Sequence, residues 1–447
     1  MRFTKHYANW FKKILPSPFS IAILITVVVF IMAILSSEKP IIDLLINWQQ
    51  GLWNSSLLAF AFQMMLMLVL GHTLALTSFF DSIINQIILR LKIGAQAAFV
   101  VTFSTIVVAL FNWGLGLIFG AIIARKVGEN FSNRKLKLNY PLIGASGYIG
   151  LMVWHGGISG SALTKVAESN HIREITNNPV MPEFISFKDT VFSSMNCMAI
   201  LLLIIIVPAI SYLIGKLTTK EIPQINTLKH APEKLVKTSG AERIDQSKWV
   251  SRIIGILLTA IAIYIAIVSK NNLGFINPNY INFSLLGLNL FLYKNIRSFL
   301  SGVDKAIRGS AGILIQFPLY FGILALMQNG GLIEIISDFF IQVSTKETLP
   351  IYTFFSAGLV NIFVPSGGGQ WALQGPIILE AALALNIPLS KIILALAYGD
   401  QITNMLQPFW ALPLLSITGL KAREILPYTL ILMLAGMVIF LIVLMLF

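Results

Sequence analysis

The chain has 447 residues, of which 56% are hydrophobic and only 11% are charged, and its mean hydropathy is +0.80. A water-soluble domain carries about 25% Asp, Glu, Lys and Arg, so a soluble enzyme, a disulfide-stabilised secreted scaffold and a disordered chain are excluded. The 32 basic residues outnumber the 19 acidic ones and lie in short loops between apolar runs, which indicates a protein embedded in a lipid bilayer rather than a nucleic-acid partner.

Apolar runs mark the expected membrane crossings, because a helix of about 20 residues spans the hydrocarbon core. The sequence predicts about nine full crossings, near residues 19–36, 52–77, 139–163, 190–215, 250–269, 280–293, 308–328, 392–418 and 425–447. Loops with acidic or balanced charge are expected outside, and loops rich in Lys and Arg inside. The first group comprises 36–51 and 164–189, and the second comprises 78–96, 124–138, 216–249 and 294–308. The basic segment 1–15 predicts a cytoplasmic N-terminus.

Two apolar stretches, 97–123 and 350–385, leave and return on the same side of the membrane by this charge count. The first lies between two inside segments, and the second lies between two loops that are expected outside. Each stretch is therefore expected to form a re-entrant helical hairpin. The expected tips have the sequences FNWGLG at 111–116 and VPSGGGQW at 364–371, in which Gly, Asn and Pro interrupt a helix.

The order of these elements repeats along the chain with opposite orientation. Residues 1–215 form an N-terminal half with the first hairpin, 216–249 form a cytoplasmic linker loop, and 250–447 form a C-terminal half with the second hairpin. An inverted repeat with two hairpins and broken helices is the plan of secondary transporters. The predicted fold is therefore an all-α polytopic membrane protein of this kind.

The two tips are the expected substrate site, because irregular backbone at membrane depth must be buried in protein or line a watery cavity. Glycines let backbone N–H groups approach a ligand, and helix N-termini favour anions, so a carboxylate can bind there without Arg or Lys. The alternative is that the glycines only pack helices closely. The candidate substrate-binding residues are Asn112, Trp113, Gly114, Gly116, Asn361, Pro365, Ser366, Gly367, Gly368, Gly369, Gln370 and Trp371.

Polar residues also gather in the crossing that follows each hairpin. Asp400 is the clearest acidic residue inside a crossing, and intramembrane ionisable groups are functional candidates. Broken helices there free carbonyls for Na⁺, and His155 is a candidate proton carrier because histidine is the side chain suited to that role. A structural, hydrogen-bonded role is the alternative for both residues. The candidate ion-coupling residues are Asp400, Gln401, Asn404, His155 and Ser159, with transported Na⁺ or H⁺ as the coupling ion and with no cofactor or resident metal.

An intramembrane protease of the rhomboid-like type and an anion channel are the alternative functions. Residues 157–160 have the sequence GISG, which matches the serine motif of rhomboids. A serine nucleophile needs a base, however, and His230 in the polar linker is the only histidine beyond residue 171. A channel also uses irregular backbone, but two hairpins of opposite entry favour alternating access. The chain is therefore not expected to be an enzyme.

Several motifs together carry a family resemblance: NWGLGL at 112–117, the stretch 154–161, PSGGGQWALQGP at 365–376, AYGDQ at 397–401 and QPFWALP at 407–413. With these residues the chain resembles, nearly end to end, the bacterial short-chain fatty acid transporters associated with acetoacetate and butyrate uptake. Two positions depart from the expected family pattern. His155 stands where Gly is expected, and Asp400 stands where Glu is expected.

The resemblance implies transport of small monocarboxylates, such as acetoacetate or butyrate, across the bacterial inner membrane. On this hypothesis the tips bind the carboxylate, and Trp113, Phe363 and Trp371 contact the short alkyl chain. Symport with H⁺ or Na⁺ through Asp400 is the accompanying hypothesis. Related carriers with inverted hairpins are often dimers, so a homodimer is a further expectation.

Overall fold

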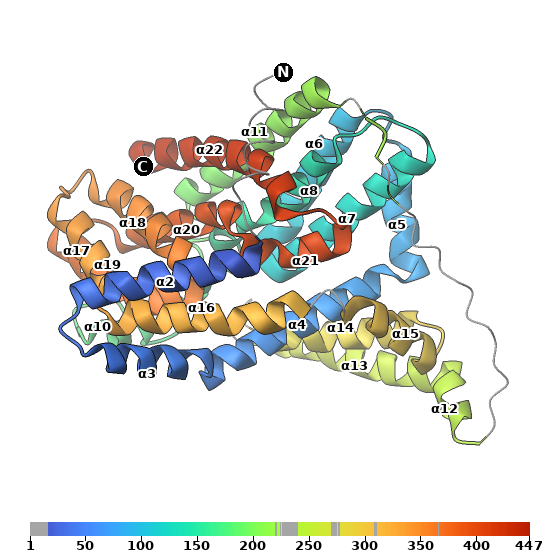
Figure 1. Ribbon diagram of the computed structural model, residues 1–447, viewed down its shortest axis with the longest axis horizontal. Coiled ribbons are helices and arrows are strands. Elements are labelled where there is room, and N and C mark those ends of the chain that lie inside the picture. Colours follow the sequence, from blue (N-terminus) through green and yellow to red (C-terminus); the bar gives the residue numbers. More distant parts are fainter. Residues whose placement is uncertain are drawn as a thin grey trace.

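The computed structural model describes residues 17–219, 221–223, 225, 240–269, 275, 278–307, 311–364 and 366–447. Within these ranges the chain is all helical and contains no strand (Figure 1). This confirms the all-α class. The predicted basic segment at 1–15, the linker residues 226–239 and Pro365 lie outside the described residues. The division into halves at 216–249 therefore stays a prediction.

Over residues 17–218, all of which the structure describes, the chain forms ten α-helices and two 3-10 helices that interrupt the crossing after the first hairpin. In chain order they are α2 (Pro18–Ser36), α3 (Ile41–Leu52), α4 (Ser55–Ala75), α5 (Ser78–Leu89), α6 (Gly94–Phe111), α7 (Trp113–Asn133), α8 (Tyr140–Tyr148), η1 (Ile149–Met152), η2 (Trp154–Gly156), α9 (Ser161–Val166), α10 (His171–Thr176) and α11 (Ser194–Thr218).

After residue 240 much of this order recurs, and the elements from α16 to α22 follow the same pattern as those from α4 to α11. They are α12 (Glu242–Gln246), α13 (Lys248–Val268), α14 (Pro278–Leu292), α15 (Ile296–Ile307), α16 (Ala311–Asn329), α17 (Leu332–Gln342), α18 (Leu349–Phe363), α19 (Gly367–Ala384), α20 (Leu389–Thr403), η4 (Asn404–Leu406), α21 (Pro408–Thr418) and α22 (Ala422–Leu446). Here η4 again breaks the crossing that follows a hairpin.

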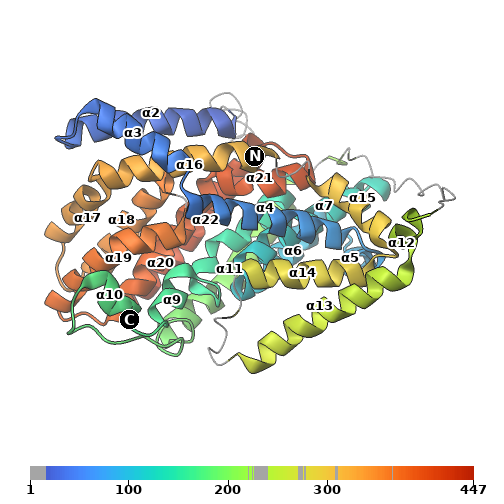
Figure 2. The same ribbon diagram turned by 90° about the horizontal axis from the view of Figure 1, so that it is seen from below.

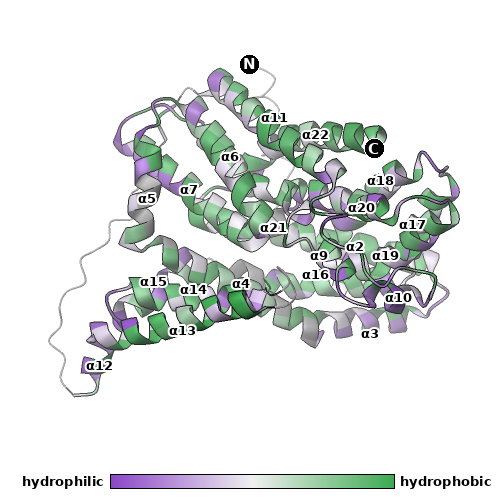
Figure 3. Ribbon diagram, turned by 180° about the vertical axis from the view of Figure 1, so that it is seen from behind, coloured by the Kyte–Doolittle hydropathy of each residue, from purple (hydrophilic) through white to green (hydrophobic). Residues whose placement is uncertain are grey.

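Length and composition mark five helices of the described residues as membrane spans, namely α2, α6, α11, α13 and α22. The count reaches seven if each of two bent pairs is one span; one of these pairs, Leu314–Asn329 with Leu332–Gln342, bends by 58°. Hydrophobic residues run along the helices, and hydrophilic ones gather in loops and in α10 and α12 (Figure 3). Among the crossings predicted from sequence, 139–163 and 392–418 are divided by the 3-10 segments, and α14 has only 15 residues.

Four shorter helices, α3, α5, α15 and α17, occupy segments that the charge pattern predicts to be loops. Their charged residues suggest loops, but their apolar residues recur at helical spacing, as in the buried face Phe299, Gly302 and Ala306 of α15. These faces pack on the longer helices. At Gly51 of α3, for example, an added Cβ would lie only 2.4 Å from Ala325 Cβ of α16. Short amphipathic helices therefore flank the crossings.

Both predicted hairpins are present, and in each a polar residue ends one helix and caps the next. Asn112 is extended (φ −152°), and its Oδ1 accepts a hydrogen bond of 2.9 Å from Leu115 N at the start of α7. Ser366 is extended in the same way (φ −151°), and its Oγ accepts from Gly369 N at 3.2 Å. Such caps stabilise the first turn of each return helix. The arms α6 and α7 lie toward one end of the long axis, and α18 and α19 lie toward the other (Figures 1 and 2).

Glycines set the close approach between each hairpin and the crossing that follows it. A Cβ at Gly120 of α7 would lie 1.9 Å from Gly147 O of α8. In the second case, a Cβ at Gly399 of α20 would lie 2.1 Å from Phe354 O of α18. Backbone occupies the space in both places, so no side-chain rotation can relieve the clash.

We expect Gly399→Ala to lower the free energy of unfolding by about 1–3 kcal/mol, because the added methyl group overpacks the α18–α20 contact. The measurement is the melting temperature of the purified protein in detergent. Gly368→Ala is the matched control, since no atom lies within 4 Å of a Cβ at that position. Equal melting temperatures for the two variants would contradict this packing account.

Candidate functional site

Trp154 of η2 contacts both hairpin tips. Its ring centroid lies 5.8 Å from that of Trp113, the first residue of α7. On the other side, a Cβ at Gly367, the first residue of α19, would lie 2.6 Å from Trp154 Cη2. The two tips predicted to meet therefore do so through a residue of the broken crossing, and this meeting point is the candidate site.

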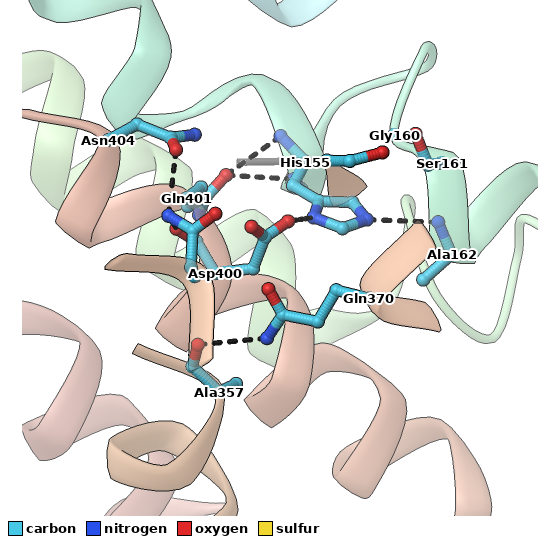
Figure 4. Close-up of polar contacts among 12 residues, drawn as sticks. His155, Gly160, Ser161, Ala162, Ala357, Gln370, Asp400, Gln401 and Asn404 are labelled. Atoms are coloured by element: carbon cyan, nitrogen blue, oxygen red, sulfur yellow. Dashed lines mark hydrogen bonds and ion pairs between the residues drawn. The ribbon is translucent and has the colours of Figure 1, made fainter. Parts of the chain in front are cut away.

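His155 and Asp400 form a buried pair (Figure 4). The His155 ring stacks on Trp154 at a centroid distance of 4.4 Å, and its Nδ1 is hydrogen-bonded to Asp400 Oδ2. His155 Nε2 accepts a hydrogen bond from Ala162 N at 2.9 Å. A ring nitrogen that accepts carries no proton, so Nδ1 holds the proton and donates it to the carboxylate. The pair is therefore a neutral histidine that donates a hydrogen bond to the aspartate.

Side chains from other helices hold the 3-10 backbone around His155. Gln401 Oε1 accepts hydrogen bonds from His155 N at 2.8 Å and from Gly156 N at 3.1 Å. Asn196 of α11 donates through Nδ2 to Gly156 O at 2.8 Å, and Tyr398 donates its hydroxyl to Asn196 Oδ1 at 2.9 Å. A broken helix leaves backbone groups without partners, and in a membrane protein these must be satisfied internally. Gln401 therefore supports the pair rather than facing a ligand.

The second break, at η4, is supported in a similar way. Asn361 donates through Nδ2 to Asp400 O and to Asn404 Oδ1, both at 2.7 Å. Tyr148 directs its hydroxyl toward Asn404 O at 2.8 Å and Gln407 O at 2.9 Å. The carbonyl groups freed at this break, which the sequence analysis assigns to Na⁺, thus already accept hydrogen bonds from the protein.

Buried side-chain oxygens around Asp400 remain without a hydrogen-bond partner among the described residues. These oxygens are Asn361 Oδ1, Gln370 Oε1, Asp400 Oδ1 and Gln407 Oε1. Figure 4 shows His155, Gln370 and Gln401 arranged around Asp400. Buried polar atoms are costly unless they are paired, so this group of acceptors suits a ligand that supplies positive charge. Carboxylate and amide oxygens suit hard cations, and a carboxylate oxygen also suits a proton.

At the first tip, the candidate residues divide between ligand-facing and packing positions. Trp113 N donates to Ser159 Oγ at 3.0 Å, which ties the first tip to the broken crossing. Gly114 lines an apolar cavity. Gly116 instead packs α7 against α6, because a Cβ there would lie 2.6 Å from Ala109 Cβ. Close helix packing, the alternative for the glycines, thus describes Gly116, whereas Gly114 both lines the cavity and allows the close approach of Met67 of α4.

At the second tip, Gly367 approaches the buried pair, since its Cβ position lies 3.0 Å from Asp400 Oδ2. Gly368 is exposed, and Gly369 serves the Ser366 cap. Trp371 is buried and donates its indole N–H to His171 Nε2 of α10 at 3.0 Å. The structure thus places Trp371 against the polar loop after α9, and we do not retain it as an alkyl-chain contact. Phe363, at the end of α18, is half-buried.

The site residues predicted from the sequence do not include Trp154, Asn196 or Gln407. Trp154 stands beside His155 in a glycine-rich stretch, which is a weak signal on its own. Asn196 is a single amide in the otherwise apolar start of α11, and Gln407 precedes the proline that begins α21. Amides inside apolar runs were the available signal for the last two, because a buried amide requires partners.

The contact between His171 and Trp371 should depend on pH. Burial, together with the nearby Lys165, lowers the pKa of His171, while Glu168 and Glu174 oppose that shift. The unfolded chain binds this proton more readily, so stability from the neutral form is present above the ordinary pKa of about 6.5 and is lost as the pH falls below it. Protonation would also remove the acceptor that Trp371 uses.

We therefore expect His171→Gln to reduce the fall in melting temperature between about pH 7.5 and about pH 5. Gln retains an acceptor for the Trp371 indole but does not titrate. Melting curves of the two proteins in the same detergent and buffers test this expectation. Falls of the same size in both proteins would show that His171 does not contribute to acid destabilisation.

The family model described as short chain fatty acid transporter matches residues 1–447. The chain is 36% identical over 457 residues to a protein of Escherichia coli (strain K12) that is named as a proposed short-chain fatty acid transporter, covering 99% of this chain and 98% of that protein. A protein of Haemophilus influenzae with the same name is 35% identical, with 96% and 95% covered.

Two solved structures match the chain at 15% sequence identity. One is the YdaH transporter of Alcanivorax borkumensis, with a TM-score of 0.46, covering 95% of this chain and 98% of that one. The other is MtrF of Neisseria gonorrhoeae, described within a class of antimetabolite efflux pumps, with a TM-score of 0.41 and coverage of 99% and 97%.

Proposed function

The chain belongs to the short-chain fatty acid transporter family, and we propose that it moves small monocarboxylates such as acetoacetate or butyrate in symport with H⁺ or Na⁺. The observation that carries the coupling proposal is Asp400, a buried carboxylate beside the second hairpin tip with one oxygen that has no partner among the described residues. In this proposal the tips accept the substrate, and Asp400 accepts the coupling cation.

Electrostatics gives the reason for coupling. In this proposal Asp400 is ionised when no cation is bound, and a carboxylate bound at the tips would add a second negative charge nearby. Two unit charges about 8 Å apart repel by roughly 2 kcal/mol at an effective dielectric constant near 20. A cation bound at Asp400 removes this repulsion, so substrate and cation favour each other's binding.

Each coupling ion has an acceptor in the structure. A proton would bind Asp400 Oδ1, because His155 Nε2 is already occupied by the Ala162 N–H and Oδ2 accepts from His155. A sodium ion would require several oxygens, and the unpartnered amide oxygens of Gln370 and Asn361 are the candidate additional ligands. Separate gradients distinguish the two ions.

The cellular setting follows from the family and the helices. The protein is a multi-pass membrane protein, and we place it in the bacterial inner membrane with its N-terminus in the cytoplasm, as the loop charges predict. The homodimer also stays a prediction, to be tested by the mass of the detergent-solubilised protein.

The two alternative functions make different demands on the site. A rhomboid-like protease needs a base at Ser159, yet Ser159 Oγ accepts from Trp113 N, while Asp400 and the Ala162 N–H occupy the two ring nitrogens of His155. That arrangement does not activate the hydroxyl. An anion channel would show flux that neither saturates nor accelerates with substrate on the opposite side, whereas a carrier shows counterflow of labelled butyrate.

The test is uptake of radiolabelled butyrate and acetoacetate into proteoliposomes with pH and Na⁺ gradients imposed separately. We expect one gradient to drive accumulation. Asp400→Asn should abolish this uphill uptake while sparing exchange, because Asn carries no charge for a cation to neutralise. Asp338→Asn, at an exposed position of α17, is the matched control. Accumulation by Asp400→Asn at the wild-type level would refute the assignment of coupling to Asp400.

A further inference from the structure

We propose that an apolar cavity beside the first hairpin tip holds the alkyl chain of the transported carboxylate, and that the indole N–H of Trp154 binds its carboxylate group. This inference rests on the proposed function and adds to it a site that selects substrates by chain length.

The cavity lies between helices that are far apart in the sequence. Its space not filled by protein atoms amounts to about 350 Å³ when the open solvent at its mouth is included. Its lining comes from α4, α7, α16 and α21 and contains no charged residue. The lining residues include Met64, Met67, Trp113, Gly114 and Trp410. A hydrocarbon chain suits these apolar walls.

Trp113 joins the cavity to the candidate site. Its ring lines the cavity, where it meets Trp410 edge-on at a centroid distance of 5.3 Å. The same ring lies 5.8 Å from Trp154, which in turn stacks on His155. An extended short-chain carboxylate can thus place its tail beside Trp113 and its carboxylate near Trp154, within reach of the buried pair.

Trp154 supplies the donor for the carboxylate. Its Nε1 is buried and has no hydrogen-bond partner among the described residues. A buried tryptophan normally pairs its N–H, because leaving it unpaired is costly. The side chain is 5% exposed and lies between the two tips, so a substrate oxygen there would complete its hydrogen bonding. A hydrogen bond to an ionised acceptor is also stronger than one to a neutral acceptor.

The flexible thioether of Met67 provides a way to change the size of the cavity. A Cβ at Gly114 would lie 2.1 Å from Met67 Sδ, so Gly114→Ala would push that side chain into the cavity. Met67→Ala would do the opposite and lengthen the cavity. Each buried methylene contributes about 0.8 kcal/mol, so affinity should rise about fourfold per added CH₂ until the cavity is full.

The experiment measures KM and kcat for uptake of the straight-chain carboxylates from acetate to hexanoate in proteoliposomes. We expect Met67→Ala to move the lowest KM to a longer acid and Gly114→Ala to move it to a shorter one. If Met67→Ala fails to fold, Met64→Ala lengthens the same cavity. Met433→Ala, at a buried position of α22 outside the cavity lining, is the matched control and should keep the wild-type profile.

Trp154→Phe tests the carboxylate half of the proposal. It removes the N–H and keeps a ring, so KM should rise about tenfold or more for every acid while kcat changes less. An unchanged chain-length profile in all cavity variants, or an unchanged KM in Trp154→Phe, would overturn this proposal. If the wild-type protein takes up none of these acids, the proposed function itself fails, which is a distinguishable result.

Discussion

A carboxyl group in a water-excluded interior needs a hydrogen-bond partner, and Asp400 has one in His155, 245 residues earlier in the chain. The pairing draws together the crossings that follow the two hairpins, and the other contacts of the site surround it. Gln401 and Asn196 secure the backbone on the His155 side, and Asn361 secures it on the Asp400 side. Removing one partner of such a buried hydrogen bond typically costs about 1–3 kcal/mol, because it leaves the other group without a partner.

In a chain with few charged residues, neutral polar side chains support the backbone where helices are broken. Where η2 and η4 interrupt the crossings, amide and hydroxyl side chains take the hydrogen bonds that a continuous helix would make for itself. In the described part of the chain, side-chain oxygens of Asp400, Gln370, Asn361 and Gln407 and the N–H of Trp154 are among the buried polar atoms without a hydrogen-bond partner. Trp154 stacks on His155, which is hydrogen-bonded to Asp400, so we propose that a cation and an anion each complete one part of the same site. Coupled binding then requires no buried Arg or Lys at the tips.

Much of this arrangement could be predicted from local sequence, because helix-breaking residues inside apolar runs are rare and costly. Asn112 and Ser366 mark the two tips, and Asp400 is identified by its charge alone. The short helices α3, α5, α15 and α17 were missed because their charges resemble those of loops. The packing partners of Trp154 and Trp371 could not be predicted from sequence either. One lies between the tips and the other bonds His171, 200 residues earlier, and only tertiary packing distinguishes them.

The central claim is that substrate and cation bind to one site and favour each other. The most direct measurement is the dissociation constant of butyrate for the purified protein by calorimetry, with Na⁺ and pH varied separately, in the wild type and in Asp400→Asn. The account predicts that one cation tightens butyrate binding by about 5- to 150-fold in the wild type and has no effect in Asp400→Asn. A wild-type dissociation constant that is the same under all these conditions would contradict it.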